Sequence, residues 1–157
     1  MIKLTYAQLN NPGFSDAVAR LSQKEGFSNA AVAYNVSRIY RQISVKLKEA
    51  RTEFAAFSEP FTLKENGVPV KEDGPTPFPF KIQPERQAEF EEQTVAFFNT
   101  ELTIESNPIT IDDLGSIDIS PADIMSLGGI IVEAVSASSA DPQVAGLTIV
   151  PELSPSH

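Results

Sequence analysis

The sequence contains no cysteine and no tryptophan among its 157 residues, and its one histidine, His157, is the last residue. Without cysteine the chain has no thiolate nucleophile, no disulfide and no sulfur ligand for zinc or an iron–sulfur cluster. A histidine at the chain end is a poor general base, so Ser-His-Asp catalysis and histidine-held metals are not expected. The sequence favours binding over catalysis, and we expect neither an enzyme nor a cofactor.

Long apolar runs are missing as well. A membrane-spanning helix needs about 18 or more consecutive apolar residues, and residues 1–6 do not begin the apolar segment of a signal peptide. We therefore expect no membrane partner and a soluble protein made in a cytoplasm. A chain of 157 residues, 41% of them hydrophobic, fits one ordinary globular domain.

Positive charge is missing from the second half of the chain. All 12 Lys and Arg lie at or before Arg86, which gives residues 1–86 a net charge of +3, whereas residues 87–157 carry a net charge of −12. Two interpretations stay open. The acids keep the second half soluble, or the basic part of one copy binds the acidic part of another copy or of a different protein.

Two short helices are predicted near the start of the chain. Residues 5–10 fit a single helical turn. Ser15 is a typical N-cap for a helix over residues 16–25, and Gly26 is a typical residue at which such a helix ends.

The longest helix signal follows a second cap at Ser28. Residues 29–58 contain neither proline nor glycine, and at 1.5 Å per residue they predict a rod of about 45 Å, longer than a compact domain of this size needs. We therefore expect the rod to project or to pack along a partner. Its apolar residues recur with the heptad spacing of a coiled coil. They are Ala33, Tyr40, Leu47 and Phe54 at a, and Val36, Ile43, Ala50 and Phe57 at d.

A small β element is predicted after the rod. Residues 61–64 and 68–70 favour strands, and Asn66-Gly67 between them tolerates the positive φ angles of a type I′ turn. The proline-rich residues 73–80 predict an extended connector with two aromatic anchors.

A second helix is predicted over residues 84–100, with Pro84 in its first turn. Phe90, Thr94 and Phe97 share one stripe of this helix, which would return along the rod and form an antiparallel helical hairpin. The aromatic residues of both helices recur at helical spacing and are predicted to lie in the core. They are Tyr40, Phe54, Phe57, Phe90, Phe97 and Phe98.

The acidic half continues with short elements. Residues 102–105 and 109–111 alternate as a pair of strands around a turn. Ser120 is the expected cap of a helix that ends at Gly128-Gly129, and residues 130–132 fit either a strand or a further turn of helix.

Serine, alanine, proline and glycine dominate from Ser136 onward, which is typical of an extended arm. Leu147, Ile149 and Val150 interrupt this arm with an apolar stretch that we expect to contact a protein partner at a sheet edge. The predicted fold class is α+β and predominantly helical. It has a long-helix hairpin with a small β element over residues 1–135 and an extended C-terminal arm over residues 136–157.

The rod carries the candidate interaction site. No acid lies between Glu25 and Glu49, and Arg38, Arg41 and Lys48 fall opposite the heptad seam, where they form a basic stripe. Phosphate contacts to nucleic acid are one use of such a stripe, but the pI of about 4.5 and the missing DNA-binding motifs favour a stripe that faces a protein or solvent.

A second candidate is a run of carboxylates. Asp112, Asp113, Asp118 and Asp123 lie within twelve residues, which raises the question of a divalent cation. The spacing does not fit an EF-hand loop. Helix capping and solubility explain these acids more simply, and we expect no metal site.

The order of these pieces resembles a family of small acidic proteins encoded by tailed bacteriophages. The residues that carry the resemblance are Glu65-Asn66-Gly67, Phe98-Asn99-Thr100-Glu101-Leu102-Thr103-Ile104, Ile111-Asp112-Asp113-Leu114 and Ile119-Ser120-Pro121-Ala122-Asp123-Ile124. The resemblance implies no catalytic residue, and it leaves the arm after Gly129 without a counterpart.

These observations lead to two functional expectations. The first is a non-enzymatic, virion-associated bacteriophage protein, structural or accessory, that assembles with itself or with another phage structural protein. The alternative is an early phage effector in the host cytoplasm whose acidic half binds and inhibits a host protein.

Overall fold

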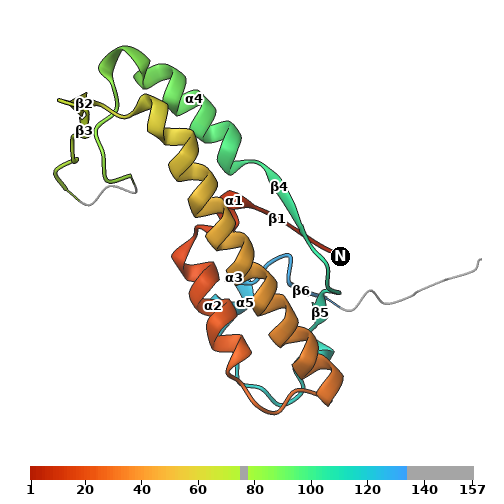
Figure 1. Cartoon of the computed structure of the whole chain (residues 1–157). Coiled ribbons are helices and arrows are strands. Elements are labelled where there is room, and N and C mark those ends of the chain that lie inside the picture. The colour runs from red at the N-terminus through yellow and green to blue at the C-terminus, as the bar shows by residue number, and fades with distance from the viewer. Residues whose placement is uncertain (75–77, 134–157) are drawn as a thin grey trace, which may run out of the picture.

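The computed structural model describes residues 1–74 and 78–133. These residues form two lobes along one long helix, α3 (Ala30–Ser58), as Figure 1 shows. The mixture of helices and small sheets agrees with the fold class predicted from the sequence, and α3 has almost the predicted bounds. Leu147, Ile149 and Val150 lie outside the described residues.

A two-stranded antiparallel sheet lies at the middle of the molecule. β1 (Ile2–Thr5) pairs with β4 (Glu101–Ile104), with Ile2 opposite Ile104 and Leu4 opposite Leu102. These four side chains alternate with exposed ones, so one face of the sheet is apolar and covered. The sequence analysis did not predict β1, although Ile2 and Leu4 already show the two-residue period of a strand.

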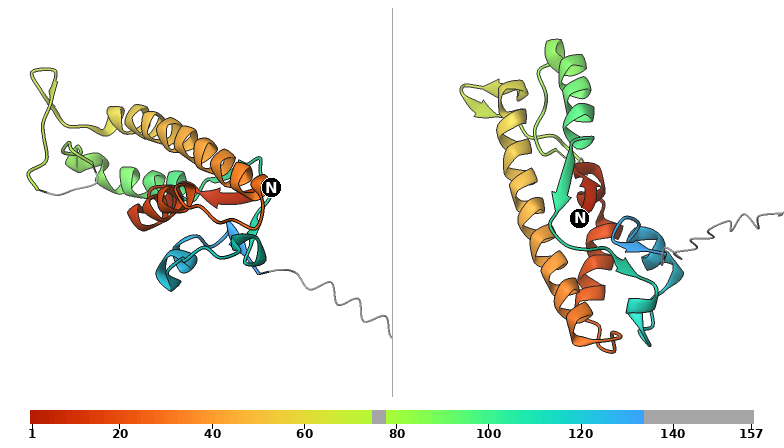
Figure 2. Two further views of the ribbon diagram at one scale, coloured as in Figure 1. Left: turned by 90° about the horizontal axis from the view of Figure 1, so that it is seen from below. Right: turned by 90° about the vertical axis from the view of Figure 1, so that its right-hand side faces the viewer.

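The lower lobe in Figure 1 contains the closed core. α2 (Pro12–Ser22) lies along the N-terminal half of α3, and α3 also contacts β4 of the sheet (Figures 1 and 2). Leu127 and Ile130 complete this core from the acidic half of the chain. The other fully packed members are Phe14, Ala17, Val18, Leu21, Val36, Ile39, Ile43, Ile109, Leu114 and Ile131.

The first helices begin earlier than predicted. α1 (Tyr6–Leu9) has a reciprocal capping box between Thr5 and Gln8. α2 then begins at Pro12, where the side chain of Asn11 accepts the Gly13 N–H at 2.9 Å. The predicted start at Ser15 and the predicted end at Gly26 are wrong, because proline fits the first helical position and the chain leaves the helix at Ser22.

The buried stripe of α3 differs from the predicted heptad. Asn29, not Ser28, caps the helix by accepting the Val32 N–H at 3.0 Å. Ile39 is 1% exposed, whereas its neighbour Tyr40, assigned to the seam, is 39% exposed. α3 packs against a sheet and helices of its own chain, so its apolar stripe follows the 3.6-residue period rather than the seam.

The tip of the upper lobe is a hairpin. A 3₁₀ turn, η1 (Glu59–Phe61), ends α3, and β2 (Lys64–Glu65) pairs antiparallel with β3 (Val68–Pro69). Asn66 and Gly67 have φ angles of 52° and 79°, as a type I′ turn requires. The turn prediction is confirmed, but the first strand begins later than expected because Phe61 belongs to the 3₁₀ turn.

The helix of the upper lobe, α4 (Gln87–Phe98), follows a 3₁₀ turn, η2 (Pro84–Arg86). It lies along the C-terminal half of α3 and contacts it through stacked and tilted phenylalanine rings (Figures 1 and 2). No helix among residues 1–74 and 78–133 has both the length and the apolar surface required to cross a membrane.

The predicted strand pair in the acidic half does not form. β5 (Ile109–Thr110) pairs in parallel with β6 (Ile131–Val132), while β4 pairs with β1. The Gln42 side chain of α3 accepts the Glu105 N–H at 2.9 Å and donates to the Ser106 hydroxyl at 3.1 Å. The chain after β4 is thus bonded to a side chain of α3, and the next strand, β5, pairs with β6 instead of with β4.

Two further elements complete the lower lobe. η3 (Asp112–Leu114) follows β5, and α5 (Pro121–Ser126) begins where predicted, with the Ser120 hydroxyl accepting the Asp123 N–H at 3.1 Å. The open question about residues 130–132 is resolved in favour of a strand.

Candidate functional site

Between Tyr34 and Lys48, α3 exposes a stripe that we call the basic face, composed of Tyr34, Arg38, Arg41, Val45 and Lys48. All five side chains are exposed, and they recur every three or four residues, so they lie along one side of the helix. The structure therefore places the three predicted interaction residues on one face. Sequence reasoning missed the two apolar members, Tyr34 and Val45, which are 65% and 55% exposed.

The cations of the basic face have no acidic partner among the residues that the structure describes. The ion pairs of α3 are confined to Lys46 and Glu49 within residues 1–74 and 78–133. Arg41 donates only to the Ser37 carbonyl, at 3.4 Å, so its charge is not neutralised. Because residues 26–48 contain no acid, the positive potential of this face is available to a partner.

Two of the four acids weighed as a cation site have structural partners. The Asp113 carboxylate accepts the Thr110 N–H at 2.9 Å, and the Asp123 carboxylate forms an ion pair with Arg20 of α2. This guanidinium holds the pKa of Asp123 below its usual value. Within the described part of the chain, no three acidic or histidine side chains come close enough to hold a metal ion.

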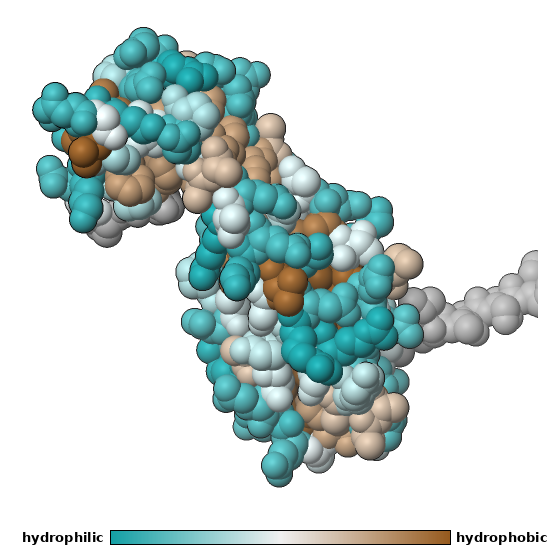
Figure 3. Space-filling model, in the orientation of Figure 1, coloured by the Kyte–Doolittle hydropathy of each residue, from teal (hydrophilic) through white to brown (hydrophobic). Residues whose placement is uncertain are grey.

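The upper lobe is built from aromatic rings. Eight of the ten phenylalanines form one connected set of ring contacts, and Phe54 of α3 lies at its centre. Its ring centroid is 5.3 Å from that of Phe98 and 5.4 Å from that of Phe97. Phe90 is buried as predicted. Phe54, Phe97 and Phe98 are only half-buried, so these rings do not close into a core. In Figure 3 apolar side chains reach the surface between the tip of the upper lobe and the lower lobe.

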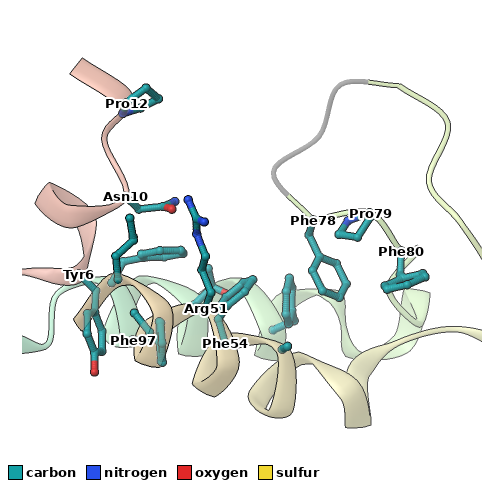
Figure 4. Close-up of a pocket in the computed structure, with 15 residues that line it drawn as sticks. Tyr6, Asn10, Pro12, Arg51, Phe54, Phe78, Pro79, Phe80 and Phe97 are labelled. Atoms are coloured by element: carbon teal, nitrogen blue, oxygen red, sulfur yellow. The ribbon is translucent and has the colours of Figure 1, made fainter. Parts of the chain in front are cut away.

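A cavity of about 760 Å³, which we call the aromatic pocket, explains the partial exposure of these rings. It lies between α3 and α4, with α1 at one end and the segment of Phe78 and Phe80 at the other (Figure 4). This volume falls in the range of small-molecule sites, about 300–1,000 Å³. Its apolar lining consists of Pro12, Leu47, Ala50, Phe54, Ala55, Phe78, Pro79, Phe80, Phe90, Phe97 and Phe98.

Four polar side chains also line the aromatic pocket. Arg51 stands beside Asn10 at the α1 end (Figure 4), and Arg51 has no ion-pair partner in the described ranges. The Thr94 hydroxyl is buried and has no hydrogen-bond partner among the described residues. The Tyr6 hydroxyl donates to Glu53 at 2.9 Å, and burial together with this carboxylate raises the pKa of Tyr6.

Sequence reasoning did not identify the aromatic pocket. Phe90, Thr94 and Phe97 were placed on the correct stripe of α4, which faces α3. The signal that a pocket forms would have been the small residues Ala50 and Ala55 opposite that stripe, because they leave space between the two helices.

No protein-family model matches the chain, and no curated protein or solved structure is significantly similar to it. Its function is therefore inferred from the geometry of the basic face and the aromatic pocket.

Proposed function

We propose that this chain is a non-enzymatic bacteriophage protein, associated with the virion, that acts by assembling with other proteins through the basic face of α3. The phage origin rests on the resemblance described above. The assembly role rests on one observation. Arg38, Arg41 and Lys48 share one exposed face with Tyr34 and Val45 and have no acidic partner within the described ranges.

The composition of the basic face supports a protein partner. Exposed arginine and tyrosine are the side chains that most often dominate the energy of protein–protein interfaces. Tyr34 and Val45 supply apolar area between the charges, which a purely solvated helix face does not need. Phosphate contacts to nucleic acid would use the cations, but they would leave the exposed apolar surface of Val45 without a partner.

A second copy of the chain offers a complementary surface. α4 exposes Glu91 and Glu92 next to Val95, which is 61% exposed. This acidic and apolar face lies on α4 in the upper lobe, whereas the basic face begins at Tyr34 near the N-terminus of α3, in the lower lobe, and ends at Lys48 past the middle of the helix. Contact between the two faces would therefore be head-to-tail, which generates rings or filaments rather than a closed dimer.

The test compares oligomeric state by size-exclusion chromatography with light scattering. We expect the wild-type chain to form species larger than a monomer that dissociate as salt rises from 50 to 500 mM, because screening weakens contacts between exposed charges. The triple variant Arg38→Gln, Arg41→Gln, Lys48→Gln should be monomeric at low salt. The matched control, with Lys24→Gln, Lys64→Gln and Lys71→Gln, removes as much charge elsewhere and should assemble like the wild type.

Mass spectrometry of purified phage particles tests the location. Recovery of the wild-type chain with the particles, and its loss in the triple variant, is the expected result. A monomeric wild type that is missing from particles would overturn the proposal. A single stoichiometric host protein in a pull-down would favour the effector alternative, and a stable complex of the basic face with DNA would contradict a protein partner.

A further inference from the structure

The aromatic pocket has more room than its own side chains fill. Most of its wall rings are half-buried, in contrast to the lower lobe, where Leu9, Ile39 and Ile104 are at most 1% exposed. Dispersion contacts are lost along any wall that faces empty space, so a pocket of this size in a folded chain favours an apolar occupant.

Two of the four polar side chains of the pocket lie together at one end. Arg51 and Asn10 lie side by side at the α1 end, whereas the opposite end is closed by Phe78 and Phe80 (Figure 4). Tyr6 is not free to serve an occupant through its hydroxyl, because that group donates to Glu53 at 2.9 Å. The pocket therefore offers one cationic donor and one amide at its α1 end, together with the Thr94 hydroxyl, unpartnered among the described residues, to an occupant that is otherwise apolar.

The guanidinium of Arg51 specifies the charge of the occupant. Arg51 has no carboxylate partner within residues 1–74 and 78–133, and unlike Arg38 and Arg41, which are also unpaired there, it lines the pocket. A guanidinium binds a carboxylate with two parallel hydrogen bonds. The positive charge of Arg51 and the apolar walls of the pocket both favour an apolar molecule with a carboxylate at one end.

The length of the pocket limits the apolar part. Leu47 and Ala55 mark its extent along α3, and eight residues of helix span about 12 Å. An extended chain advances roughly 1.2 Å for each covalent bond. A chain of about ten carbons therefore matches the extent of the pocket along α3.

We infer that the aromatic pocket binds an amphipathic monocarboxylate, a medium-chain fatty acid in chemical class, with its carboxylate on Arg51 and its chain between α3 and α4. The Asn10 amide donates to the second face of the carboxylate. The chain covers the rings of Phe54 and Phe97, which the protein alone leaves half-exposed. This inference does not depend on the proposed assembly.

Isothermal titration calorimetry with decanoate, below its micelle concentration, tests the inference on the full chain. We expect saturable binding at one site per chain, and binding that strengthens about fourfold for each added methylene from hexanoate to decanoate. Decanol, which has the same chain and no charge, should bind about tenfold more weakly. Absence of saturable decanoate binding, or equal affinity for decanol, would overturn the inference.

Three variants locate the site. Arg51→Gln should weaken decanoate binding about tenfold, while Arg38→Gln, the same substitution on the basic face of the same helix, should leave it unchanged. Ala55→Phe fills the pocket from an exposed helix position, so it should abolish binding without changing the circular dichroism spectrum. Equal affinities for Arg51→Gln and Arg38→Gln would overturn the inference even if Ala55→Phe failed to fold.

Discussion

Gly115, in the acidic half of the chain, packs against the segment just before α3. Its replacement by alanine is the sharpest test of how these two segments pack in the lower lobe. Gly115 follows η3 with φ 61° and ψ −122°, a backbone conformation that is essentially restricted to glycine. A Cβ atom at this position would lie 2.9 Å from the Gly26 carbonyl oxygen and 3.0 Å from the Ser28 nitrogen. The same contact includes the hydrogen bond from the Ser28 N–H to the Asp113 carbonyl, at 3.1 Å.

Three terms determine the expected cost of Gly115→Ala. The unfavourable backbone conformation costs about 1–3 kcal/mol. Moving the backbone of residues 26–28 to relieve the close contact costs about another 1–3 kcal/mol. Alanine reduces the entropy of the unfolded chain, which offsets about 0.4–1 kcal/mol. The net loss in the free energy of unfolding is about 3 kcal/mol, equivalent to roughly 9 °C in Tm for a chain of this size.

Substitutions at two other glycines separate the energetic cost of the backbone conformation from the cost of the close contact. Gly67 also has a positive φ, 79°, but nothing lies within 4 Å of a Cβ there, so Gly67→Ala should cost only about 1 kcal/mol. Gly128 has no positive φ, and its Cβ would be 3.4 Å from the nearest atom, the Met125 carbonyl oxygen. Gly128→Ala should therefore change the stability by less than about 0.5 kcal/mol.

Urea unfolding followed by circular dichroism measures all three variants under one set of conditions. The expected order of destabilisation is Gly115→Ala, then Gly67→Ala, then Gly128→Ala. If Gly115→Ala were no more destabilising than Gly67→Ala, residues 113–115 would not pack against residues 26–28 in the way described.

Three further predictions concern single side chains. Ile104 is 0% exposed, so Ile104→Ala should lower the free energy of unfolding by about 3–4 kcal/mol, whereas Val95→Ala, at a position 61% exposed, should change it by less than about 0.5 kcal/mol. Thr94→Val keeps the shape of the side chain and removes its unpartnered hydroxyl, so thermal unfolding should show a gain of about 1 kcal/mol. Arg20 lowers the pKa of Asp123 below its ordinary value of 3.8. The ion pair therefore stabilises the folded chain fully above about pH 3.8, and this stabilisation is lost as the pH falls through the lowered pKa of the folded state. Asp123→Asn should therefore be less stable than the wild type in urea at pH 7, and the difference should shrink at pH 3; an equal difference at both values would exclude this role for the pair.

Local signals predicted several elements correctly. The limits of α3 follow from a capping residue before residue 30, a run without proline or glycine, and Pro60 after Ser58. Asn66-Gly67 and the Ser120 cap were predicted for the same reason, since the hydrogen bonds that fix such turns are made within three or four residues.

Long-range pairing accounts for most of the differences. β1 and β4 are about 100 residues apart in the sequence, and nothing local identifies which segment pairs with which. The strand over residues 109–110 was assigned to its nearest neighbour, but Gln42 of α3 holds the intervening backbone and leaves β6 as the partner. The position of Tyr40 was wrong because the heptad frame assumes a helix partner, whereas a sheet and several helices cover α3.

Part of the candidate site could also be predicted from local sequence, and part depends on the tertiary structure. The sequence by itself determined the charge of each segment and the position of Arg38, Arg41 and Lys48 on one side of a helix, because helical periodicity fixes which residues share a face. Only the tertiary structure decided that this face stays uncovered, since burial depends on which other elements fold onto α3. It also decided that the rings of α3 and α4 enclose a pocket with Arg51 at one end, because a cavity is a property of the packing of distant segments and has no local signal.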